Sequence, residues 1–189
     1  MKANRLTLQR WWLLSARGTL YILIGATMFI FASTYSVQSG QIIGAMALLA
    51  GILQLVFSFS NRLEKNNVWG ILHGIADIGF GIAIILLSNG TLEGFVDVLG
   101  FWAMMYAFLQ AVQAMYAFMA ARGVTGAGGI SSNSFIHLAN VLVAGGLTFT
   151  LMLHPAGFDN SMGYIGIFPI ALGILIVLLT GQMRTQATM

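Results

Sequence analysis

Among the polar residues that interrupt the apolar stretches of the sequence, six have side chains that could carry chemistry. They are Arg17, Gln54, His73, Asp77, Gln110 and His137. An ionisable residue inside a membrane span costs at least ~2.5 kcal/mol on insertion scales, so each needs a structural or functional reason. Histidine changes charge near neutral pH, and a histidine close to a carboxylate is typical of a proton-responsive site.

His73 and Asp77 are four residues apart, which puts them on one face of a helix with Asp77 one turn deeper, close to mid-bilayer. Gly74 and Gly81 fall on the same face, within an arc of about 100°. We therefore expect this face to meet protein or water rather than lipid. The functional hypothesis is a His73–Asp77 pair whose protonation changes helix packing, with His137 across the bundle.

Other interpretations of these residues stay open. Arg17 is expected to extend to the lipid headgroups, and histidines and glutamines near helix ends often form hydrogen bonds between helices. His73 and His137, at equal depth, could instead hold a haem iron. The sequence has no cysteine, no Ser-His-Asp spacing, no H-E-x-x-H and no phosphate loop. We therefore expect no catalytic residues, no metal site, no resident cofactor and no enzyme activity.

The composition determines which elements must position these residues. Of 189 residues, 58% are hydrophobic and 7% charged, whereas soluble domains average about 25% charged. The mean hydropathy is +0.88. With ~20 apolar residues needed for each transmembrane helix, the chain has room for at most about seven spans and no soluble catalytic domain. The sequence therefore predicts an all-α, polytopic membrane protein with a single transmembrane domain, 1–189.

Six apolar stretches are long enough to span a membrane, and short polar segments separate them. Strands of a barrel would alternate polar and apolar residues, but these stretches are apolar on all sides. The predicted spans are Trp12 to Phe31, Gln41 to Phe59, Val68 to Leu87, Phe95 to Ala120, Phe135 to Leu153 and Gly163 to Thr180.

The charges predict the orientation of these spans. All eight basic residues fall at the start of the first span, in every second loop or in the tail, while the opposite loops carry Glu93, Asp97 and Asp159. By the positive-inside rule, both termini are cytoplasmic. The basic pI of about 9.6 thus indicates membrane orientation rather than nucleic-acid binding.

The sequence contains an internal repeat of one helical hairpin. A shift of 56 residues superposes Gly18 on Gly74 and Gln54 on Gln110, and a weaker third copy follows. The three predicted hairpins occupy about 11–60, 68–121 and 134–180. Because each contains two spans, all enter from one side, which predicts a pseudo-threefold six-helix bundle. Under this alignment Arg17, His73 and His137 are at equivalent positions of the three hairpins. Together with Gln54 and Gln110 they are predicted to form a polar layer.

Glycines recur at intervals of seven residues and so keep to nearly one face of their helices. Small residues on one face let helix backbones approach closely in lipid, so we expect these glycines at helix contacts. They are Gly18, Gly25, Gly44, Gly51, Gly74, Gly81, Gly166 and Gly173.

Several motifs resemble the HdeD family of small bacterial membrane proteins. They are Trp11-Trp12-Leu13-Leu14 followed by Arg17-Gly18, the three-hairpin layout, and the second-helix pattern G-A-x-A-L-x-x-G-x-x-Q ending at Gln54. The resemblance implies a bacterial inner-membrane protein with a role in acid-stress resistance, and it supplies no catalytic residues.

These observations leave three functional hypotheses. The first is a non-enzymatic role in acid or envelope stress tolerance, the second a small transporter or channel with a proton-responsive polar site, and the third a haem-binding helical bundle. A pore would require a polar path along the bundle axis, whereas an axis filled with Gly, Leu and Ile would argue against conduction. The expected partner is the lipid bilayer. The sequence leaves open whether the protein forms a homo-oligomer and whether it binds protons or a small ligand.

Overall fold

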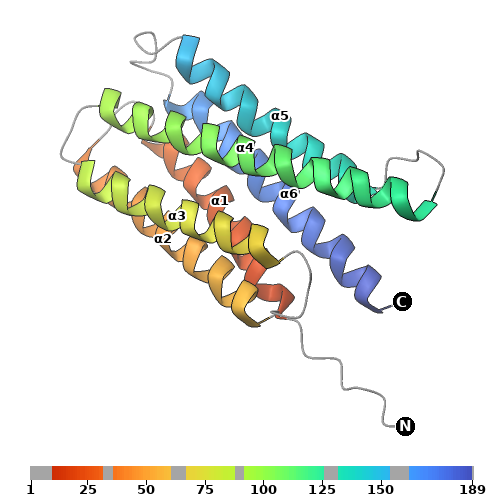
Figure 1. The fold of residues 1–189 in the computed structure, drawn as a ribbon. Helices are drawn as coiled ribbons and strands as arrows, with labels where there is room; N and C mark the ends of the chain where they lie inside the picture. Colours follow the sequence, from red (N-terminus) through yellow and green to blue (C-terminus); the bar gives the residue numbers. More distant parts are fainter. Residues whose placement is uncertain are drawn as a thin grey trace.

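A computed structural model describes residues 10–31, 36–60, 67–87, 92–125, 132–153 and 162–188. Some side chains within these ranges, among them that of His137, lie outside the described part. The described residues form six helices and are arranged as an elongated bundle (Figure 1). The helices are α1 (Trp11–Ile30), α2 (Val37–Ser60), α3 (Asn67–Leu87), α4 (Leu92–Thr125), α5 (Ser132–Leu153) and α6 (Met162–Thr188).

Five of these helices are long and apolar enough to cross a membrane: α1, α2, α3, α4 and α6. In α5 the apolar stretch among the described residues is shorter, Leu138–Leu151. The all-helical class predicted from composition is confirmed. The long apolar helices indicate a membrane protein. Large apolar side chains also face outward from the bundle, as lipid-exposed helices require.

The second helix begins earlier than predicted, at Val37 rather than Gln41, because two serines cap it. The Oγ of Ser36 accepts a hydrogen bond from the backbone N–H of Ser39 at 3.2 Å. In return, the Oγ of Ser39 accepts one from the backbone N–H of Ser36 at 3.0 Å. Such a reciprocal cap satisfies donors that the first helical turn leaves unpaired. The sixth helix likewise continues beyond the predicted Thr180 to Thr188.

The helices form a closed ring. Each helix packs against its neighbours in the sequence, and α1 also packs against α6. One connected apolar core takes side chains from all six helices and fills the interior of this ring. Its largest fully buried members include Tyr21, Met28, Phe95, Leu99, Tyr106, Leu147 and Leu172.

Two helix pairs in this ring, α1 with α6 and α2 with α3, meet backbone to backbone through glycines. A Cβ added to Gly51 would lie 2.7 Å from the carbonyl oxygen of Gly74, so the close approach depends on the missing side chain. The repeat places equivalent glycines at the same points of both pairs. The facing glycines are Gly18 and Gly173, Gly25 and Gly166, Gly44 and Gly81, and Gly51 and Gly74.

Candidate functional site

A cluster of buried polar side chains lies inside the ring, where four helices each contribute two residues one turn apart. Residues four apart share a face of a helix, so each pair points into the bundle together. The pairs are Arg17 and Tyr21 on α1, Gln54 and Ser58 on α2, His73 and Asp77 on α3, and Tyr106 and Gln110 on α4.

An ion pair between Arg17 and Asp77 forms the centre of this cluster. Nη2 of Arg17 lies 2.9 Å and its Nε 3.1 Å from Oδ2 of Asp77. The exposed fraction is 5% for Arg17 and 1% for Asp77. The prediction that Arg17 extends to the headgroups is therefore wrong. The guanidinium turns inward because Asp77 lies one helical turn deeper and can neutralise it.

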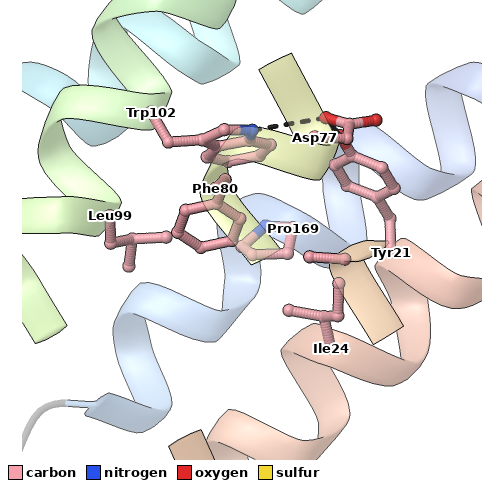
Figure 2. A pocket seen from close by; sticks show the side chains of 8 residues that line it. Tyr21, Ile24, Asp77, Phe80, Leu99, Trp102 and Pro169 are labelled. Atoms are coloured by element: carbon pink, nitrogen blue, oxygen red, sulfur yellow. Dashed lines mark hydrogen bonds between the residues drawn. The ribbon is translucent and has the colours of Figure 1, made fainter. Parts of the chain in front are cut away.

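Further donors surround the Asp77 carboxylate. The hydroxyl of Tyr21 donates to Oδ1 at 2.6 Å, and the indole N–H of Trp102 donates to the same oxygen at 3.3 Å. Figure 2 shows Tyr21 and Trp102 converging on Asp77 from α1 and α4. A buried ion pair is tolerated only when such additional hydrogen bonds satisfy its remaining polar atoms.

A side chain of α2 provides a further hydrogen-bond acceptor for Arg17. Nη1 of Arg17 donates to Oε1 of Gln54 at 3.1 Å, and Nε2 of Gln54 donates to Oγ of Ser58 at 3.3 Å. The absence of a side chain at Gly70 gives this amide its room, since a Cβ there would lie 2.7 Å from Nε2 of Gln54. The ion pair thus ties α1 and α3 together and connects them to α2.

His73 lies beside the ion pair rather than in it. Its Nδ1 is 2.8 Å from the carbonyl oxygen of Trp69, and its Nε2 is 3.1 Å from the amide nitrogen of Gln110. A carbonyl can only accept, so Nδ1 carries a proton, and Nε2 accepts from the amide. His73 is held as a neutral imidazole in this arrangement. Asp77, the expected partner of His73, is paired with Arg17.

Aromatic rings connect the histidine to the ion pair. The ring of Tyr106 meets His73 edge to face with centroids 5.0 Å apart, and it packs on Trp102 at 5.4 Å. Nε2 of Gln110 also donates to the hydroxyl of Tyr106 at 3.4 Å. The ring of Tyr106 therefore connects His73 to Trp102, which is one of the donors to Asp77.

A small cavity adjoins Asp77 in the centre of the ring. Tyr21, Phe80, Leu99, Trp102 and Pro169 are among its lining residues (Figure 2). Its volume of about 10 Å³ corresponds to the room that one water molecule needs. Pro169 lies within α6, where its ring leaves one helical carbonyl without a backbone donor.

The structure brings together five of the six predicted polar residues: Arg17, Gln54, His73, Asp77 and Gln110. The sixth, His137, belongs to α5, but its side chain lies outside the described part. Sequence reasoning missed Tyr21, Trp102 and Tyr106. One signal was available for Tyr21, because the shift of 56 residues superposes it on Asp77. Equivalent residues of two repeats meet when both face the bundle axis.

The part of the chain that carries the ion pair is similar to a known protein family. Residues 16–86 match the model of a family described as a short repeat of unknown function, DUF308. This segment, a little over a third of the chain, is similar to the DUF308 repeat. That family domain includes HdeD-like membrane proteins, which confirms the resemblance found in the sequence. No curated protein and no solved structure gives a significant match to the chain.

The matched segment contains α1 from Ala16 onward, all of α2, and α3 up to Leu86. Both partners of the ion pair, together with Tyr21, Gln54 and His73, fall inside it. The indole of Trp102 and the side chains of Tyr106 and Gln110 come from α4, which follows the matched segment. The polar cluster is therefore built mainly from the segment that matches DUF308 and is completed by the next helix.

Proposed function

We propose that the chain is a six-span protein of the bacterial inner membrane, built from three hairpins around a pseudo-threefold axis, with both termini cytoplasmic. The closed ring supports this arrangement, as do the matching glycine contacts in two of its helix pairs. The start of α1 and the end of α6 lie at the same end of the bundle (Figure 1). The one-sided distribution of Lys and Arg supports the orientation.

Single cysteines test this orientation, because the natural chain contains none. A cysteine in place of Arg184, an exposed residue of α6, is expected to react with a membrane-impermeant maleimide only after the cells are opened. A cysteine in place of Gln38, exposed at the start of α2, is expected to react in intact spheroplasts. The reverse pattern would contradict the proposed topology.

We further propose that the protein has a non-enzymatic role in acid or envelope stress tolerance, in which protonation of the polar cluster changes the packing of α3 against α4. The observation that carries the proposal is the hydrogen-bonding of His73. Both ring nitrogens are hydrogen-bonded in a way that suits the neutral imidazole, and histidine ordinarily changes charge between pH 5 and 8.

Protonation of His73 would place two donors face to face. The new N–H on Nε2 would point at the amide group of Gln110, which itself donates toward His73. The amide of Gln110 must then rotate to present its oxygen, and this changes its contact with Tyr106. We propose that this rotation, which exchanges a donor for an acceptor between α3 and α4, alters how the two helices pack.

The ion pair makes the cluster sensitive to the loss of either charge. Without the Asp77 carboxylate the buried guanidinium of Arg17 would have no counterion, and an uncompensated buried charge is strongly unfavourable. The groups that face this carboxylate are Arg17 and Tyr21 on α1 and Trp102 on α4. These interactions hold α1, α3 and α4 together around the carboxylate.

Survival of bacteria after acid exposure tests the proposed role. Cells producing the natural protein are expected to survive better than cells with an empty vector, and His73→Gln is expected to remove this advantage. Glutamine can still accept a hydrogen bond from Gln110 but does not become charged. His154→Gln, the same substitution in a predicted loop, is the matched control and keeps the advantage. Equal protection by His73→Gln would contradict the proposal.

Neither alternative function is favoured by the geometry. A pore along the axis is disfavoured because apolar side chains from all six helices fill the ring, and the cavity beside Asp77 has room for about one water molecule. Haem ligation by His73 would require breaking its hydrogen bond to Trp69 or to Gln110. An absorbance spectrum of the purified protein tests the haem alternative directly.

A further inference from the structure

The contact between α4 and α5 differs from the two glycine-mediated contacts of the ring. The repeat makes Gly100 and Gly145 the counterparts of Gly44 and Gly81, which face each other across α2 and α3. A Cβ on Gly100 would first meet Leu151, at 3.6 Å, and one on Gly145 would meet nothing within 4 Å. The α4–α5 contact is therefore open at the level where its counterpart is closed.

This opening forms a groove of about 320 Å³ on the outer surface of the bundle. Its α4 side carries Asp97, Gly100 and Met104, and its α5 side carries Thr148 and Leu151. Residues 97, 100 and 104 of a helix share one face, so the groove runs along α4 rather than across it. All three lie within Gly94–Tyr116, which is long and apolar enough to cross a membrane, so we expect lipid around this groove.

The groove has a charged end and an apolar end. Asp97 is five residues after the start of α4, so it lies about 7–8 Å along the helix from that start. Met104 lies two turns further into the bundle. The start of α4 is at the end of the bundle opposite to the start of α1 (Figure 1). A carboxylate thus marks the membrane boundary, and an apolar channel leads from it toward mid-bilayer.

Asp97 is exposed and makes no hydrogen bond or ion pair with any residue that the structure describes. The sequence places no lysine or arginine in the loops of this end. A second copy in the same orientation would therefore bring no lysine or arginine to Asp97. A cationic group that pairs with Asp97 would come from another molecule of the membrane.

We propose that this groove binds one phospholipid with a primary ammonium headgroup, of the ethanolamine type. The ammonium donates charge-assisted hydrogen bonds to the Asp97 carboxylate, and one acyl chain lies along Gly100 and Met104 between α4 and α5. The arrangement of charge at the boundary and apolar surface below it matches the layout of a phospholipid. An anionic headgroup without an amine would instead meet a like charge.

Native mass spectrometry of the full chain in mild detergent tests this site with three phospholipids that share their acyl chains. We expect the ethanolamine lipid to bind roughly tenfold more tightly than the glycerol lipid, as expected for hydrogen bonds to a charged group. The choline lipid, whose quaternary ammonium group is cationic but has no N–H, is expected to fall between them. No preference among the three would overturn the proposal.

Two variants separate the headgroup contact from the acyl-chain contact. Asp97→Asn is expected to remove the headgroup preference while weak binding continues. Gly100→Leu fills the groove and is expected to reduce binding of all three lipids, whereas Gly79→Leu adds the same side chain at an exposed, open position of α3 and is expected to change nothing. A preference that survives in Asp97→Asn overturns the proposal. So does a dimer that Gly100→Leu dissociates, since a second copy would then occupy the groove.

Discussion

The Asp77→Leu variant is expected to lose about 3–5 kcal/mol of its free energy of unfolding, the largest effect of any single substitution in the polar cluster. The loss arises because the substitution leaves the guanidinium of Arg17 buried without a counterion. Unfolding in mixed detergent micelles, followed by circular dichroism, measures it. Asp97→Leu, which removes the same kind of side chain from an exposed position, should stay within about 0.5 kcal/mol.

A double variant distinguishes a lost ion pair from a general packing defect. In Arg17→Met with Asp77→Leu neither charge remains, so we expect the double variant to regain at least about half of the stability that Asp77→Leu loses. Apolar replacement of a whole buried ion pair is often neutral, whereas removal of one partner is not. A double variant less stable than either single variant would contradict the assignment of the Arg17–Asp77 contact as the cluster's main electrostatic interaction.

Alanine at the facing glycines is expected to cost about 1–3 kcal/mol each, because the added methyl group meets a neighbouring backbone that can move only if the helices separate. In Gly173→Ala the Cβ would lie 2.5 Å from the carbonyl oxygen of Gly18 and 2.9 Å from the backbone nitrogen of Ile22. In Gly51→Ala it would lie 2.7 Å from the carbonyl oxygen of Gly74. The same unfolding measurement applies.

Glycines without close neighbours provide the controls for this prediction. A Cβ on Gly79 or Gly145 meets nothing within 4 Å, so alanine there should be neutral or should stabilise the helix by about 0.5–1 kcal/mol through lower backbone entropy. If all four alanine variants had the same stability, close backbone contact could not be what holds α1 to α6 and α2 to α3.

The sequence predicted the helices and their glycine faces because both follow from one-dimensional patterns. Apolar length determines where a span can exist, and spacing determines which residues share a face. The depth of Arg17 and Asp77 was predictable in the same way. Their pairing was not, because it depends on the rotation of α1 relative to α3 and on the reach of the arginine side chain, neither of which a hydropathy pattern contains.

The aromatic residues of the cluster escaped prediction for a related reason. Tyr21 and Trp102 look like ordinary apolar residues of a span, and only their position next to a buried carboxylate gives their polar atoms a role. The open α4–α5 contact could not be predicted from the sequence either. Gly100 and Gly145 fit the repeat as well as the glycines that do meet, so the departure is a property of packing alone.

The most direct test of an acid-responsive packing of α3 against α4 is a distance measurement between spin labels on these two helices. Cysteines in place of Ile75 and Phe108, which are 56% and 67% exposed, would be the only attachment sites in a chain without natural cysteine. Between about pH 8 and about pH 5, where histidine changes charge, we predict a shift or broadening of the distance distribution that His73→Gln abolishes. Identical distributions at both pH values, or an equal shift in His73→Gln, would contradict the account.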